Sequence, residues 1–243
     1  MPAVQVVFEP LPPPLAPEPA PHVEILFPYL GKSVPAAHAN DYEVRLRVEN
    51  WSGRVQLALD DYRPVVVENA TERVPLGSLV PADRDLAPGN HRLFAVAVDE
   101  QGRMLRAARP TARAPFAVVD FRIGSRVALP DERPFIAYSQ PRGTYNGDAA
   151  ADAVFVDFYL VGVERFPGSR VRVQVLGAGR SWTHTLPTWQ PVRIRGLPSG
   201  DFDVEVTLLD AQGTTIPEVG APRRTITINR DAPLPPQTGV EAR

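Results

Sequence analysis

Cysteine is absent from this chain of 243 residues, and so is the chemistry that depends on it. Without a thiol the protein forms no disulfide, no thiolate-bound zinc site and no cysteine nucleophile, and the redox environment is left open. Long apolar runs are also lacking, so the sequence predicts no membrane span. The formal net charge of −2 argues against a nucleic-acid partner. Proline, in contrast, is abundant, with 28 residues.

Apolar residues recur at every second position along much of the chain. In "YEVRLRVE", Tyr42, Val44, Leu46 and Val48 point one way and the charged residues between them point the other. The same alternation occurs in "RVRVQV", "VRIRGL", "DVEVTL" and "RTITIN". Alternation of this kind is typical of half-buried antiparallel strands. Because no stretch has a helical stripe, the sequence predicts an all-β protein.

One segment of the chain is repeated 111 residues later. "DLAPGNHRLFAVAVDEQG" (85–102) shares its leucine, glycine and Asp-x-Gln-Gly positions with "GLPSGDFDVEVTLLDAQG" (196–213). Glycine supplies the positive φ that a tight turn needs, and an aspartate can bond to the turn backbone. The repeat predicts two similar domains whose hairpins superpose, Gly89 on Gly200 and Gly102 on Gly213.

The predicted organisation is two tandem immunoglobulin-like or fibronectin-III-like β-sandwich domains behind a proline-rich N-terminal tether. "EPLPPPLAPEPAP" reads as a stiff, polyproline-like spacer because proline lacks an N–H donor. The predicted segments are a tether (1–21), a first sandwich (22–123), a linker (124–132), a second sandwich (133–230) and a flexible tail (231–243).

The repeated hairpin resembles the closing hairpin of uncharacterised bacterial envelope domains with an L-x-P-G-x-H-x-L pattern. "YSQPRGTYNGDAAADAVFVDFYLVG" and the segment that follows it resemble the second half of hypothetical exported bacterial proteins. Some relatives of the hairpin carry a histidine cluster, whereas here only His91 occupies the pattern. The resemblance implies an exported, lipoprotein-type protein in the periplasm or at the outer membrane or cell surface. The N-terminal segment lacks the features of a signal peptide, which leaves two alternatives, a cytoplasmic protein or an export signal with a lipid-anchored cysteine before residue 1, and we favour the second.

No catalytic or metal-binding motif emerges from the sequence. The four histidines have neither each other nor a carboxylate at the spacing of metal ligands, and the serines lie in plain turns. Asn146, Asp148 and Asp152 are calcium candidates, but they lack the register of a known loop, and a solvated turn is favoured. We expect no catalytic residue, no metal, no cofactor and no enzymatic activity.

The binding residues predicted from the sequence are Tyr138, Arg142 and Tyr145. They lie in "YSQPRGTYNGDAAAD" (138–152), the longest loop that we infer in the second domain. Tyrosine and arginine are enriched at binding hot spots, and long loops are often functional. The alternative is that this loop only caps the sandwich. Its counterpart in the first domain is "PYLGKSVPAAHAND" (28–41).

These features predict a non-catalytic module that binds a protein or glycan partner of the cell envelope, or spaces parts of an envelope assembly. One alternative is a carbohydrate-binding module, which an exposed coplanar aromatic pair among Trp51, Trp182, Trp189 and the tyrosines would support. The other is a hydrolase with a dispersed active site, which needs a serine, a histidine and a carboxylate in one cleft. Two glycosylation triplets, at Asn50 and Asn69, matter only in a host that uses that pathway.

Overall fold

The chain forms two β-sandwiches, so the all-β fold with two tandem sandwiches is confirmed. The computed structural model describes residues 5–68, 72–108, 114–124, 134–164, 166–187, 189–219 and 223–232. The chain divides into two compact units, residues 13–139, which contain the first sandwich, and residues 1–12 with 140–243, which contain most of the second. The boundary between the units lies inside one strand, β10 (Phe135–Gln140), which pairs in a sheet of the second sandwich. No helix among the described residues is long and apolar enough to cross a membrane.

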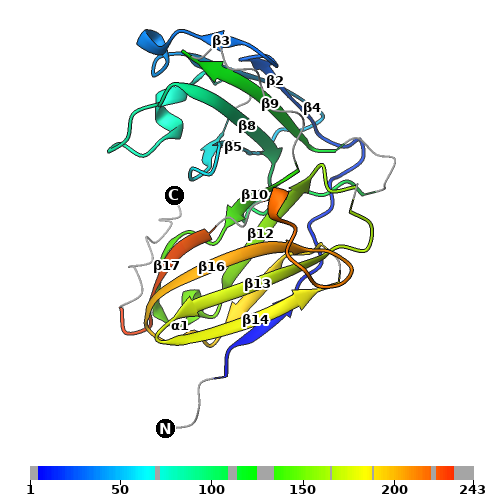
Figure 1. Cartoon of the computed structure of the whole chain (residues 1–243), viewed down its shortest axis with the longest axis vertical. Helices are drawn as coiled ribbons and strands as arrows, with labels where there is room; N and C mark the ends of the chain where they lie inside the picture. Colours follow the sequence, from blue (N-terminus) through cyan, green and yellow to red (C-terminus); the bar gives the residue numbers. More distant parts are fainter. Residues whose placement is uncertain are drawn as a thin grey trace, which may run out of the picture. The chain divides into compact units, whose positions relative to one another are not determined.

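The first sandwich pairs a three-stranded sheet with a five-stranded sheet (Figure 1). The smaller sheet has the order β2-β4-β7, with bounds His22–Phe27, Glu43–Glu49 and Val74–Pro75. The larger sheet has the order β3-β9-β8-β5-β6, with bounds Ser33–Val34, Phe116–Ile123, Gly89–Ala97, Val55–Leu59 and Val65–Val67. Two short 3-10 helices connect strands, η1 (Ala36–His38) and η2 (Leu76–Leu79).

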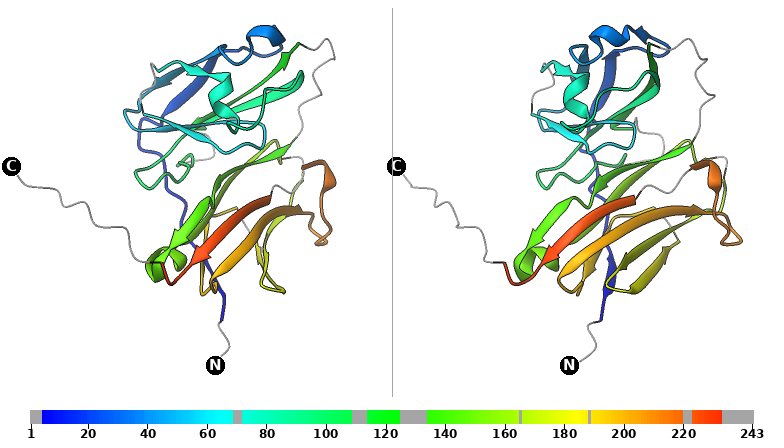
Figure 2. Two further views of the ribbon diagram at one scale, coloured as in Figure 1. Left: turned by 90° about the vertical axis from the view of Figure 1, so that its left-hand side faces the viewer. Right: turned by 60° about the vertical axis from the view of Figure 1, so that its left-hand side comes forward.

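The second sandwich repeats this plan with one strand more (Figures 1 and 2). One sheet has the order β1-β15-β12-β10, with bounds Val7–Pro10, Val192–Arg195, Val154–Val161 and Phe135–Gln140. The other has the order β11-β17-β16-β13-β14, with bounds Gly143–Asn146, Arg223–Asn229, Gly200–Leu209, Arg170–Gly177 and Arg180–Leu186. A helix, α1 (Gly147–Ala151), lies beside β17, and η3 spans Pro217–Val219.

Alternating side chains build the cores as the sequence predicts. In β4, Val44 and Leu46 are buried while Arg45 and Arg47 are exposed. Apolar residues from both sheets of the first sandwich meet in one core cluster, among them Ile25, Val44, Leu57, Leu93 and Phe121. Burying such side chains is the main stabilising contribution to a sandwich of this size.

The repeated hairpin has the same geometry in both sandwiches, as predicted. Gly89 and Gly200 open the equivalent strands β8 and β16 with φ of 155° and 143°. Gly89 pairs with Ile123, and Gly200 pairs with Ile228. In each following turn one aspartate oxygen accepts two backbone N–H bonds, Asp99 from Gln101 (3.0 Å) and Arg103 (2.8 Å), Asp210 from Gln212 (2.9 Å) and Thr214 (2.8 Å).

The predicted tether (1–21) is not a free spacer along its whole length. Residues 7–10 form β1, an edge strand of the second sandwich, and Pro10 ends it, where a missing N–H donor is tolerated. Farther along, the backbone N–H of Ala16 donates to the carbonyl of Arg106 (2.8 Å). Most of the predicted linker and the tail beyond residue 232 lie outside the described residues, as does the glycosylation triplet at Asn69.

The predicted loop 138–152 is also more ordered than its sequence suggests. β10 continues to Gln140, β11 follows after two residues, and α1 completes the segment. β11 pairs in parallel with β17, Tyr145 opposite Ile228. In the first sandwich β3 pairs in parallel with β9 in the same way, Val34 opposite Ile123. These short strands form because distant strands offer them hydrogen bonds, a signal that local sequence does not carry.

Candidate functional site

The three predicted binding residues do not form one surface. Tyr138 is buried, with 5% of its surface exposed. Arg142 and Tyr145 do come together, since the Tyr145 hydroxyl accepts a hydrogen bond from the backbone N–H of Arg142 (3.2 Å). Burial raises the pKa of Tyr145, and the Arg142 N–H and charge oppose that rise. Tyr145 is therefore half-buried and bonded within its own corner, and binding through Arg142 and Tyr145 stays a prediction.

The equivalent corner of the first sandwich presents apolar side chains to solvent. Leu26, Tyr29 and Leu30 have 38%, 55% and 70% of their surface exposed. Among the described residues, five large hydrophobic residues are exposed, and these three lie within one stretch of five positions. Such residues scattered singly need no explanation, whereas a group of them at one place marks an interaction site.

The tip of this corner is held rigidly against β9. The Gly31 N–H donates to the Asp120 carbonyl (2.9 Å), and the Lys32 N–H donates to the Tyr29 carbonyl across the turn (2.9 Å). The Arg122 guanidinium donates to the Gly31 carbonyl (2.8 Å). Gly31 has φ of 78°, which a residue with a side chain rarely adopts. Tyr29 and Leu30 are thus presented on a fixed backbone.

Aromatic rings and cations surround the tip. The Phe27 ring stacks on Tyr42 (centroids 5.0 Å apart) and lies 6.0 Å from Tyr29. The Lys32 ammonium lies 5.6 Å from the ring centres of both Phe27 and Tyr29, within range of a cation–π interaction. We call the group Phe27, Tyr29, Leu30, Lys32, Tyr42 and Arg45 the aromatic corner.

Strand register shows how the two corners differ. Val34 and Tyr145 are equivalent, because each pairs with the isoleucine opposite the repeated glycine. Val34 comes six residues after Pro28, but Tyr145 comes only four after Pro141. The two extra residues of the first sandwich make room for the exposed tip. From the sequence, loop 28–41 is predicted only as the counterpart of loop 138–152. The signal for its exposed tip is "PYLG", in which two large apolar residues stand between a proline and a glycine.

Two of the three calcium candidates, Asp148 and Asp152, bind the side chain of an arginine. The Arg230 guanidinium donates to Asp148 (2.7 Å) and to Asp152 (2.6 Å). This hydrogen bond from Arg230, with the Gly196 N–H, lowers the pKa of Asp152. The arrangement ties the end of β17 to α1. No group of three metal-ligating side chains occurs in the part of the chain that the structure describes.

His91 is bonded on both ring nitrogens. Nδ1 lies 2.8 Å from the Asp60 carboxylate, and Nε2 lies 2.8 Å from the Ala87 carbonyl. A histidine–carboxylate pair is one part of a hydrolase triad, but the second nitrogen must then face a nucleophile. Here it faces a backbone carbonyl, so this pair has the geometry of a structural clamp.

The tryptophans are half-buried and anchored internally. The indole N–H of Trp51 donates to the Arg54 carbonyl (3.0 Å), and that of Trp189 to the Phe158 carbonyl (2.8 Å). Trp189 meets the Tyr159 ring edge-on at 4.3 Å, and Trp182 lies 6.1 Å from Phe202. None of these pairs is coplanar, so the carbohydrate-binding alternative stays a prediction.

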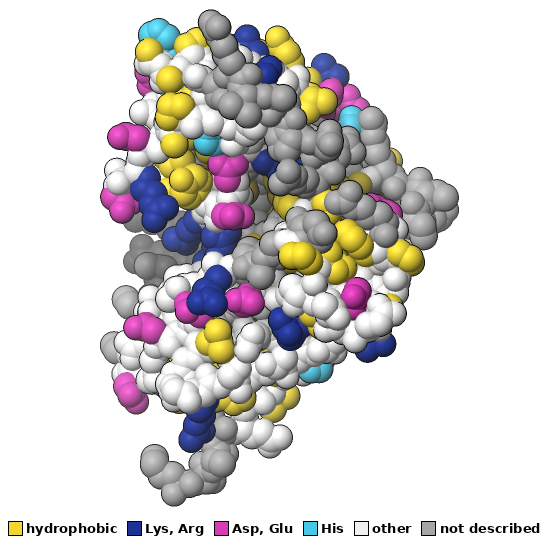
Figure 3. Space-filling view, viewed as in Figure 1, with side chains coloured by type: hydrophobic (Ala, Val, Ile, Leu, Met, Phe, Trp, Pro, Cys, Tyr) yellow, Lys and Arg dark blue, Asp and Glu magenta, His cyan; other side chains and the backbone are white. Residues whose placement is uncertain are grey.

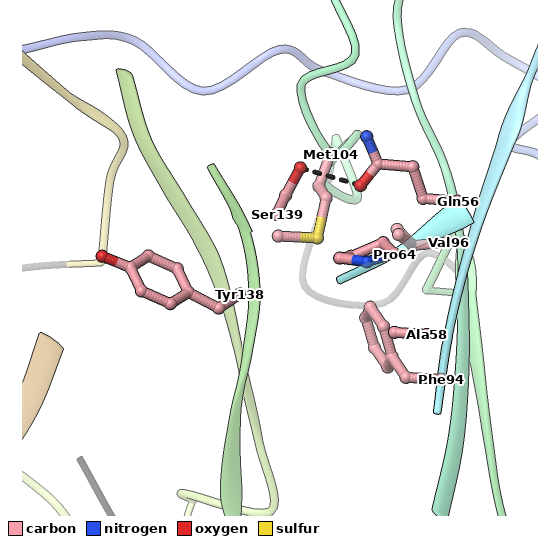
Figure 4. Close-up of a pocket in the computed structure, with 8 residues that line it drawn as sticks. All are labelled: Gln56, Ala58, Pro64, Phe94, Val96, Met104, Tyr138 and Ser139. Carbon is pink, nitrogen blue, oxygen red and sulfur yellow. Dashed lines mark hydrogen bonds between the residues drawn. The ribbon is translucent and has the colours of Figure 1, made fainter. Parts of the chain in front are cut away.

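The five-stranded sheet of the first sandwich has one face in the core, and a small pocket lies on its opposite face (Figure 4). Its lining is mostly apolar, and Ser139 donates to the Gln56 side chain across it (2.8 Å). Tyr138 points to the opposite side of its strand from Ser139. The lining contains no histidine and no carboxylate.

Comparison with known proteins adds a likeness in fold. No family model matches the sequence, and no curated protein matches it. Among solved structures, the fibronectin(III)-like modules of CbhA from Clostridium thermocellum are 15% identical over 86% of this chain and 94% of that chain, with a TM-score of 0.29. The D00-D0 domain of intimin is 11% identical over 85% and 99%, with a TM-score of 0.25.

A third solved structure is SGBP-B from the mixed-linkage glucan utilization locus of Bacteroides ovatus, in complex with a mixed-linkage heptasaccharide. It is 13% identical over 84% of this chain and 47% of that chain, with a TM-score of 0.26. Likeness at this level says nothing about the activity of this chain.

Proposed function

We propose that this protein is a non-catalytic binding module whose first sandwich engages a protein partner through the aromatic corner. The observation that carries the proposal is the exposure of Tyr29 and Leu30 on a turn that β9 holds in place. A rigid turn loses little conformational entropy on binding, and tyrosine anchors are common at hot spots.

The chemistry of the corner favours a protein over a glycan. Leu30, the most exposed of the apolar residues, suits an apolar pocket on a partner and not a sugar ring. A sugar ring would stack on an aromatic face, but the Lys32 ammonium already lies over the Phe27 and Tyr29 rings. Acidic and basic side chains are interspersed on the face drawn in Figure 3.

We place the partner in a bacterial cell envelope, and the protein in the periplasm or at the cell surface, held there by a lipid anchor. This part of the proposal rests on the resemblance of the repeated hairpin to envelope domains.

Photo-crosslinking from the corner tests the proposal. A photoreactive residue at Leu30 should yield a specific protein adduct in envelope extract, identified by mass spectrometry. In a pull-down without cross-linking, the double change Tyr29→Ser with Leu30→Ser should abolish capture of that protein. The matched control, Arg142→Ala with Tyr145→Phe in the other corner, should capture it normally. Loss of capture in the control alone would move the site to Arg142 and Tyr145. Binding of an envelope polysaccharide that the corner variant loses would favour the glycan reading.

A further inference from the structure

β1 belongs to the second sandwich but precedes the first sandwich in the chain. It spans Val7–Pro10, and the rest of its unit begins only at Gln140. The complete first sandwich is therefore inserted between this strand and the sheet that it joins. Among the described residues, every other strand of the second sandwich lies between Phe135 and Asn229, so β1 is the strand most distant in sequence from its partners.

The contacts of β1 are specific. It pairs antiparallel with β15, Phe8 opposite Ile194 and Glu9 opposite Arg193. The Glu9 carboxylate accepts two hydrogen bonds from Arg193 (2.9 and 3.0 Å) and lies 3.0 Å from Arg195. The Phe8 ring stacks on His184 of β14, with centroids 5.5 Å apart and planes 9° apart.

The first sandwich forms without a counterpart of β1 among its described residues. Its equivalent sheet ends at β7, a two-residue strand that includes a proline, and the described residues add no strand beyond it. β15 is longer, at four residues, and without β1 it would expose unpaired backbone groups. Edges of this kind recruit strands from other chains.

The hinge after β1 is short. Leu11 still donates to the Pro191 carbonyl (2.8 Å), and the Arg106 N–H already donates to the Pro14 carbonyl (2.8 Å). Only Pro12 and Pro13 lie between these two fixed points. Short hinges favour exchange of an element between copies over closure within one chain.

We propose that β15 is a strand-exchange site, and that its second occupant is β1 of another copy of this chain, in a reciprocal two-fold dimer. Every contact of β1 is reproduced when the strand comes from the partner copy, so exchange costs mainly the freedom lost on association. The dimer should therefore accumulate as protein concentration rises.

The absence of native cysteine makes a clean test available. Val7 and Arg195 are opposite each other and both exposed, and cross-strand pairs lie within disulfide range. Two full-length chains, one with Val7→Cys and one with Arg195→Cys, are mixed at high concentration, warmed below the melting temperature and oxidised. Mass spectrometry then measures the disulfide between residues 7 and 195 of different chains.

The control mixes the Val7→Cys chain with an Arg47→Cys chain, whose cysteine is exposed on the first sandwich. We expect about tenfold more mixed disulfide from the register-matched pair, because pairing raises the local thiol concentration. A chain carrying both Val7→Cys and Arg195→Cys, oxidised at high dilution, should stay monomeric when concentrated. Equal yields from the matched and control mixtures, or a cross-link that forms only within the double variant, would overturn the proposal.

Discussion

His91 in the first sandwich and Phe202 in the second occupy the same position of the repeated hairpin, two residues after its glycine. His91 is an ion-paired clamp, bonded to Asp60 and Ala87. Phe202 is 1% exposed, and a Cβ at Gly177 would collide with its ring. The backbone frame is thus shared, whereas an inward-facing side chain can be polar or apolar as long as its neighbours satisfy it.

Of the changes that test this difference between the two sandwiches, Phe202→Ala should have the largest effect on the free energy of unfolding. Phe202→Ala removes a fully buried ring and leaves a cavity, so we expect a loss of about 3–5 kcal/mol in the free energy of unfolding. His91→Ala removes a smaller side chain at the sandwich end and should cost less. Urea unfolding of both variants followed by tryptophan fluorescence measures the difference. Equal losses would show that the two positions are not energetically distinct.

The shared part of the hairpin should respond in the same direction in the two sandwiches, although Asp99 also accepts a hydrogen bond from the Arg103 side chain (2.8 Å). Asp99 and Asp210 each accept two backbone N–H bonds in the Asp-x-Gln-Gly turn. Asp99→Ala and Asp210→Ala should each lower the free energy of unfolding by about 1–2 kcal/mol, because two turn donors lose their acceptor. Asparagine at either position keeps an acceptor oxygen and should recover part of the loss. A cost at only one of the two turns would contradict the equivalence.

Sequence alone predicted the features whose causes are local. The alternation in "YEVRLRVE" gives β4, and the glycines and aspartates of the repeat give two matching turns, because each depends on residues a few positions apart. β1, β3 and β11 escaped prediction. Their partners lie far away in the chain, as with Ser33 and Arg122, and short strands show too few alternations to be recognised.

For the candidate site, the sequence identified both corner loops and predicted binding through Arg142 and Tyr145, which stays a prediction. The structure adds the exposed Tyr29 and Leu30 of the other corner. Whether a tyrosine points inward depends on the length of the turn and on its pairing strand. Tyr145 sits opposite Ile228 and is half-buried, whereas Tyr29 lies on a tip two residues longer. That difference appears only when the two corners are aligned by register.

The polar clamp at His91 predicts a pH dependence that Phe202 cannot have. Burial lowers the pKa of His91, but the bonds to Asp60 and Ala87 outweigh it, so the folded pKa is raised above 6.5. A raised pKa stabilises the fold fully below pH 6.5, and this contribution is lost as the pH rises through the folded value.

Urea midpoints at about pH 6 and about pH 8.5 should therefore show a larger drop for the wild type than for His91→Phe, which copies the second sandwich. His91→Gln, polar but not titratable, should behave like His91→Phe. An equal drop in all three chains would mean that His91 does not contribute to the pH dependence.

The smallest expected effects separate the two corners. Leu30 is 70% exposed and packs little, so Leu30→Ser should change the free energy of unfolding by less than about 0.5 kcal/mol. Tyr145→Phe removes the acceptor of the Arg142 N–H and should cost about 1 kcal/mol. Thermal unfolding of the two variants beside the wild type measures the contrast, with Tyr29→Phe as a control that keeps the exposed ring. A melting temperature that falls further for Leu30→Ser than for Tyr145→Phe would make the aromatic corner a structural element, because a surface kept for a partner contributes to binding and not to the stability of the free chain.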